Sequence, residues 1–133
     1  MSRPPDSVGA VERAVRAVND RDVDGYLACC TEDVELWLPT AAVGGAYEGP
    51  DGVRRFFADI EDAGPDFRLD LERAEEIRPD VVIASVRFSA SGRSSGIPMD
   101  MSNTNVYDLA AGKIRQVRVF SDRVEAMRAA GRP

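Results

Sequence analysis

The chain has 133 residues, of which 44% are hydrophobic and 30% are charged, a composition typical of a folded globular protein and not of a disordered one. Its 17 basic and 23 acidic residues give a net charge of −6 without any Lys/Arg block, which argues against nucleic acid or an anionic membrane as a partner. Histidine is absent, which excludes Ser-His-Asp and Cys-His catalysis and His-ligated zinc.

The length and the cysteines favour one domain in a reducing compartment. We expect a single domain over residues 1–133, with residues 1–6 as a Pro-containing lead-in. The first residues lack an apolar signal core and no apolar run approaches about 18 residues, so we expect a cytoplasmic protein without a membrane span. Cys29 and Cys30 are adjacent, a spacing that would strain a disulfide. They are therefore expected to be small buried side chains, and a reactive thiol is the alternative.

The first half of the chain predicts three helices around one strand. Apolar residues recur at helical spacing after Ser7, and Asp22 is placed to cap a short second helix. "EDVELWLP" alternates apolar and polar residues as a strand does, and Pro39 ends it. "TAAVGGAYEG" indicates a loop, and "GPDGVRRFFADIEDAG" indicates a third helix with Pro50 near its start and Gly64 at its end.

The second half of the chain predicts strands followed by a terminal helix. The four strand-like segments are "DFRLDLERAEEI", "DVVIASVRFSAS", "MDMSNTNVYDL" and "KIRQVRVF", joined by "RPD", "GRSSG" and "AAG". "SDRVEAMRAAG" then predicts a helix that stops at Gly131. Helices clustered early and antiparallel strands late favour an α+β domain, with a curved, antiparallel-rich sheet wrapped around helices into a cone that has an internal pocket.

One strand carries an unusual set of side chains. Because side chains alternate along a strand, one face of "MDMSNTNVYDL" carries Met99, Met101, Asn103, Asn105 and Tyr107. This set is too polar to pack dry and too apolar for a solvated face. We therefore expect it to line a cavity, although internally paired polar residues, or a surface strand shifted by one residue, would give the same pattern.

Three segments carry a family resemblance that covers the chain from about Val8 to Gly131. "NDRDVDGYLACCTEDVELWLP", "YEGPDGVRRFF" and "AAGKIRQVRVFSDRVEAMRAAG" resemble the nuclear transport factor 2-like superfamily, especially its SnoaL-like polyketide cyclase branch. The resemblance implies a cystatin-like α+β barrel and a homodimer. Members of this superfamily include cofactor-free isomerases, cyclases, dehydratases and epoxide hydrolases, and also proteins without catalysis, so the fold alone does not give the function.

The key residues of the superfamily's known mechanisms are missing at the matching positions. Alignment with the ketosteroid isomerase branch places Ala14 at the catalytic Tyr, Leu38 at the base and Asn105 at the late acid, so only Asn105 keeps a hydrogen-bonding group. Val119 stands where limonene epoxide hydrolase-like members have an Asp. SnoaL-like cyclases in several cases use a nearby His, which this chain lacks.

The predicted site combines polar donors with an apolar lining. Asn105, Asn103 and Tyr107 are the candidate catalytic residues, because amide and phenol donors can hold an enolate or carbonyl oxygen. For Tyr26 and Glu48 the alternatives are a core side chain and a helix cap or solvated charge. The expected substrate-binding residues are Tyr26, Leu36, Leu38, Met99, Met101, Val117, Val119 and Glu48.

Two functions are consistent with these residues, and a third follows if the cone is filled. The first is a secondary-metabolism enzyme, an isomerase, cyclase or lyase without cofactor or metal, that acts on an apolar oxygenated, polyketide-like substrate. The second is a non-catalytic small-molecule-binding or accessory protein of the same fold, favoured by the missing base. The third is a structural dimerisation module whose own side chains would fill the cone.

Overall fold

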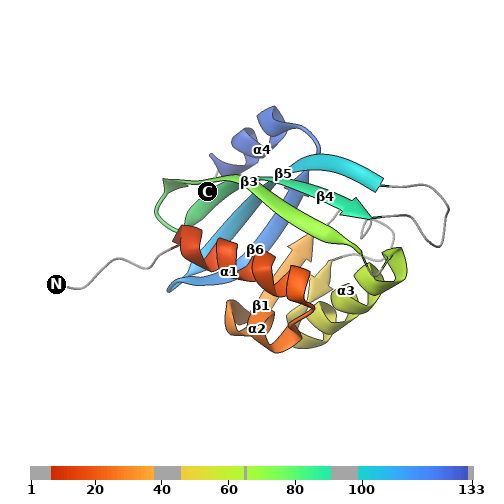
Figure 1. Ribbon diagram of the computed structural model, residues 1–133. Helices are drawn as coiled ribbons and strands as arrows, with labels where there is room; N and C mark the ends of the chain where they lie inside the picture. Colours follow the sequence, from red (N-terminus) through yellow and green to blue (C-terminus); the bar gives the residue numbers. More distant parts are fainter. Residues whose placement is uncertain (1–6, 38–45, 65, 91–98, 132–133) are drawn as a thin grey trace.

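The computed structural model describes residues 7–37, 46–64, 66–90 and 99–131 (Figure 1). The helices are α1 (Ser7–Asp20), α2 (Val23–Ala28), α3 (Gly49–Ala63) and α4 (Arg123–Ala130). The strands are β1 (Cys30–Trp37), β2 (Tyr47–Glu48), β3 (Arg68–Arg78), β4 (Val81–Ala90), β5 (Met99–Ala110) and β6 (Lys113–Phe120). The predicted α+β class and the order of the predicted elements are confirmed, and no helix in these segments is long and apolar enough to cross a membrane.

The strands form one curved sheet in the order β2-β1-β6-β5-β4-β3. Neighbouring strands are antiparallel except β1 and β6, which are parallel. Helices α1, α2 and α3 lie on the inner face, and α4 lies on the outer face (Figure 1). The sheet begins at β2 and ends at β3 without closing, and α3 and α1 pack against these two edge strands.

The segment before α3 differs from the expected loop. Residues Tyr47 and Glu48 form β2, which pairs with β1 through Leu36 opposite Tyr47. A two-residue strand is too short to show alternation, which explains why the sequence pattern did not reveal it. Gly52 lets α3 approach this strand closely, because a Cβ at Gly52 would lie 2.7 Å from the Tyr47 carbonyl carbon.

Helix caps and burial position the two layers. Asp22 accepts a hydrogen bond from the Gly25 amide at 2.9 Å, and Asp122 accepts one from the Val124 amide at 2.7 Å, so each fixes the start of its helix. The larger core lies between α1, α2, α3 and the inner face. A smaller core lies between α4 and the outer face and consists of Val81, Ile83, Val106, Ala126 and Ala130.

Candidate functional site

A cavity lies between the inner face of the sheet and the helices. Its volume is about 60 Å³, room for on the order of four water molecules. Among the residues expected at the site, it brings together Tyr26, Leu36, Asn105, Tyr107, Val117 and Val119.

Strand geometry explains this convergence. Asn105 and Tyr107 are two residues apart on β5, so their side chains share the inner face. In the β5–β6 ladder Asn105 is paired with Val119, and Tyr107 is paired with Val117. The two valines therefore lie beside the two polar residues and make the apolar part of the same wall.

Five expected site residues lie away from the cavity or fall outside the part of the chain that the structure describes. Met101 is 53% exposed, Glu48 is exposed where it precedes α3, and Asn103 is half-buried, and none of the three lines the cavity. Met101 and Asn103 precede Asn105 on β5, opposite Phe88 and Val86 of β4, and the cavity begins only at Asn105. Leu38 lies outside the described residues, as does the side chain of Met99.

Five lining residues were not predicted from the sequence: Ala14, Val15 and Val18 on α1, Phe56 on α3 and Leu69 on β3. The Phe56 ring centroid is 6.4 Å from that of Tyr26 and 5.7 Å from that of Tyr47, so an aromatic cluster borders the cavity. Phe56 and Phe57 lie three and four residues after Val53, and both spacings place a side chain on the same helix face as Val53. The sequence pattern therefore does not show which of the two rings lines the cavity.

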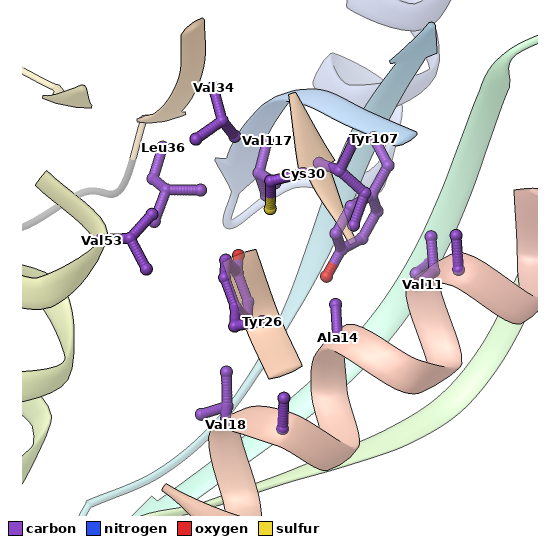
Figure 2. Packing of buried hydrophobic residues seen from close by; sticks show 14 of the residues in the cluster. Val11, Ala14, Val18, Tyr26, Cys30, Val34, Leu36, Val53, Tyr107 and Val117 are labelled. Carbon is purple, nitrogen blue, oxygen red and sulfur yellow. The ribbon is translucent and has the colours of Figure 1, made fainter. Parts of the chain in front are cut away.

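Two tyrosine hydroxyls supply much of the polarity of the cavity. In Figure 2 the hydroxyls of Tyr26 and Tyr107 point into the space between α1 and the sheet, where Ala14 faces Tyr107. Burial raises the pKa of both tyrosines, and the hydrogen bond from Asn105 offsets part of the rise in the pKa of Tyr107. Both hydroxyls therefore stay protonated near neutral pH and can donate hydrogen bonds, but they are poor proton acceptors.

The neighbouring thiol is also protonated. Burial raises the pKa of Cys30 to about 12, with a smaller contribution from Cys29 and an opposing one from Lys113. No Asp, Glu, Lys or Arg is among the described residues that line the cavity. The site is thus uncharged, and a neutral ligand enters it at the least desolvation cost.

Asn105 is the third polar group and is incompletely satisfied. It is 8% exposed, and its Nδ2 donates a long hydrogen bond of 3.4 Å to the Tyr107 hydroxyl. Its Oδ1 is buried without a hydrogen-bond partner in the structure. Buried polar atoms are nearly always paired in native proteins, so this unpaired oxygen is unusual.

A metal site is not indicated in the part of the chain that the structure describes. No group of three or more Cys, Asp or Glu side chains there is arranged to hold a metal ion. The chemistry that these cavity residues can supply is hydrogen bonding, shape and exclusion of water.

Comparison with known proteins identifies relatives of this cavity-bearing fold. The SnoaL-like domain profile matches residues 11–117, whereas no curated protein matches significantly. A putative SnoaL-like polyketide cyclase from Jannaschia sp. CCS1 has a similar structure, with a TM-score of 0.75 and 20% identity over 100% of this chain and 99% of that one. TerC, co-crystallised with polyporic acid, has a TM-score of 0.74 and 22% identity over 93% of this chain and 96% of its own.

A third similar structure also contains a small molecule. Rv0760c from Mycobacterium tuberculosis, in complex with estradiol-17beta-hemisuccinate, has a TM-score of 0.73 and 20% identity over 90% of this chain and 95% of its own. At these identities the similarity shows the shared fold.

Proposed function

The chain belongs to the SnoaL-like domain family, and we propose that its inner cavity binds a small, neutral, largely apolar molecule that carries oxygen. The observation that carries the proposal is the placement of Tyr26, Asn105 and Tyr107 as the uncharged hydrogen-bonding side chains in an otherwise apolar cavity. Such a cavity holds a ligand by shape and orients it through a few polar atoms. Polyporic acid in the TerC crystal and the estradiol derivative in the Rv0760c complex are oxygen-containing small molecules, which supports a small-molecule site in this fold.

On this ligand we propose cyclisation, isomerisation or dehydration of a polyketide-like compound in secondary metabolism, without a cofactor. The similarity to a putative polyketide cyclase supports this activity. Tyr26 and Tyr107, held protonated by burial, would donate hydrogen bonds to an oxygen that gains negative charge in the transition state. Catalysis would come from orientation and oxyanion stabilisation, with the proton passing through the substrate's own groups or water.

A non-catalytic binding or accessory protein is the second candidate. It is favoured by the absence of an ionised side chain from the described cavity lining, since the familiar mechanisms of the superfamily use such a group as a base. A protein of this kind would release its ligand unchanged.

The test is native mass spectrometry of the purified protein, followed by thermal-shift measurements with polyketide, steroid and terpenoid-epoxide panels. A ligand that binds the native state raises the unfolding temperature by mass action. We expect one class to do so for the wild type, and Tyr107→Phe to reduce the shift. Tyr47→Phe is the matched control, because it removes a hydroxyl outside the cavity lining. No shift with any panel would overturn the proposal, and analysis of bound compounds for conversion separates enzyme from binder.

We also propose a cytoplasmic homodimer. Two free cysteines fit a reducing compartment. On the outer face Trp37 is 46% exposed, a large aromatic surface of the type that protein interfaces use. Light scattering should give twice the chain mass of 14.5 kDa, and Trp37→Arg should shift the protein towards monomer. A wild-type protein that is monomeric at all concentrations would contradict the dimer.

A further inference from the structure

A second depression lies outside the inner cavity, on the surface between α1, α2 and the turn that joins β5 to β6. We call it the α1–α2 groove; its charged lining residues are Arg13, Arg16, Asp20, Asp22 and Lys113, and its other lining residues are all Gly, Ala or Cys. The volume of the groove is about 460 Å³. It shares no lining residue with the inner cavity, so the two are separate sites.

Three cations gather at this groove. Arg13 and Arg16 are three residues apart on α1, so their side chains share one face of the helix, and Lys113 joins them from the start of β6. None of the three forms an ion pair with a residue that the structure describes. By contrast, Arg68 and Arg87 on the sheet each contact a nearby carboxylate.

The two carboxylates at the groove do not neutralise these cations. Asp22 is engaged at the start of α2, where it accepts a hydrogen bond from the Gly25 amide at 2.9 Å. Asp20 lies four residues after Arg16, about 6 Å further along the α1 axis, and the structure shows no ion pair between them. The groove therefore carries net positive charge, although the whole chain has a net charge of −6.

This arrangement of cations is unfavourable without a bound anion. Like charges three or four residues apart on a helix repel each other, and Lys113 adds a third positive charge from another element. An anion at the same place would replace repulsion with attraction. Arginine presents parallel N–H donors to the oxygens of a carboxylate or phosphoryl group, and lysine binds phosphate as a point charge. A phosphoryl group has three terminal oxygens, one for each cation, whereas a carboxylate has two.

We propose that the α1–α2 groove binds the phosphoryl group of a small phosphate ester through Arg13, Arg16 and Lys113. Because the other lining residues are small, no bulky side chain occupies the space for the organic part of the ester. Asp20 and Asp22 disfavour a polyanion such as nucleic acid, since further phosphates would meet negative charge. This ligand is distinct from the neutral molecule proposed for the inner cavity.

The test is an NMR titration of the whole protein with methyl phosphate and, in parallel, with acetate, at a constant ionic strength set with sodium chloride. Amide chemical shifts of residues 16, 112 and 113 report the groove. We expect methyl phosphate to bind about tenfold more tightly than acetate, the ratio that one additional charge-assisted hydrogen bond produces.

Three variants test the role of charge at the groove. Arg16→Gln should weaken methyl phosphate binding about tenfold, because it removes a charged donor and retains a good helix former. Asp20→Asn should strengthen binding about threefold, because it removes a neighbouring negative charge. Arg123→Gln is the matched control: it removes the same charge from an exposed position on α4, on the outer face of the sheet, and should leave the dissociation constant unchanged.

Several results would overturn the proposal. Equal binding of methyl phosphate and acetate would contradict the phosphoryl assignment, and the absence of a saturable shift at the groove would contradict the site. An Arg123→Gln variant that lost as much affinity as Arg16→Gln would show a general effect of net charge. Weaker binding to Asp20→Asn would contradict the assigned role of charge. Circular dichroism and thermal unfolding establish that each variant is folded, and none of these results bears on the inner cavity, which has a different lining.

Discussion

The two faces of the sheet use polar side chains differently. On the outer face, charged residues on neighbouring strands form pairs: Arg87 contacts Asp100 at 2.6 Å and Arg118 contacts Asp108 at 3.0 Å. The Nε atom of Arg118 is buried without a hydrogen-bond partner, but Nη2 of the same guanidinium donates to Asp108. On the inner face Asn105 is neutral and half-satisfied. The outer charged groups satisfy one another, whereas the inner amide keeps one oxygen without a hydrogen-bond partner.

The largest expected effect is loss of the fold in alkali, because burial on the inner face disfavours the ionised forms of a thiol and of tyrosine hydroxyls. Burial raises the pKa of Cys30 from 9.0 to about 12, and the pKa of Tyr26 and Tyr107 is also raised. The folded state thus holds these protons more tightly than the unfolded state. Their contribution to stability is present below about pH 9 and is lost as the pH rises towards 12.

Urea unfolding between pH 7 and 11, with tyrosinate absorbance at 295 nm, measures this loss. The absorbance should appear together with unfolding. Tyr47 should also ionise only on unfolding, since burial and its hydrogen bond to Asp59 raise its pKa to about 12. Cys30→Ala should flatten the decline that begins near pH 9. Tyrosine ionisation near pH 10 in a fully folded protein would contradict the assignment.

Truncation of the inner core should cost more than truncation at the outer helix. Ile114 is fully buried between the sheet and the helices, so Ile114→Ala should lower the free energy of unfolding by about 2–5 kcal/mol. Val124 on α4 is 60% exposed, and Val124→Ala should change it by less than about 0.5 kcal/mol. Urea titration followed by circular dichroism measures both. Equal losses would show that the inner core does not dominate stability.

Removal of one polar side chain should change the free energy of unfolding in opposite directions on the two faces of the sheet. Asn105→Leu removes an incompletely paired amide from an apolar cavity and should raise the free energy of unfolding by about 1–2 kcal/mol. Arg118→Met breaks a partly buried pair, leaves Asp108 without its partner and should lower it by about 1–3 kcal/mol. Thermal and urea unfolding of both variants test the signs. A destabilised Asn105→Leu would mean that the amide is structural.

The fold was predictable because its elements are long and periodic, as the agreement of the expected and observed strands shows. The same alternation along β5 placed Asn105 and Tyr107 on one face, and the structure places both at the cavity. It did not reveal where the helices stop covering that strand, so Met101 was expected inside and is exposed. Coverage is a tertiary property that depends on helix packing, and a strand's own period carries no information about it.

The smallest expected effect concerns the backbone conformation of the turn between β5 and β6. Ala111 has φ +52° and Gly112 has φ +81°, the positive values of a type I′ hairpin turn, and alanine is strained in this conformation. Ala111→Asn should raise the free energy of unfolding by about 0.5–1 kcal/mol, because asparagine tolerates the left-handed region.

Gly112→Ala is the matched control and should lower the free energy of unfolding, since it adds a Cβ at a positive φ. Both turn variants should show the same ligand-induced rise in unfolding temperature as the wild type, because neither residue lines the cavity. Asn105→Leu should resemble Ala111→Asn in stability and differ from it in binding. If Ala111→Asn also lost the ligand-induced rise, stabilisation itself would explain the loss, and the loss in Asn105→Leu would not locate the ligand at the cavity.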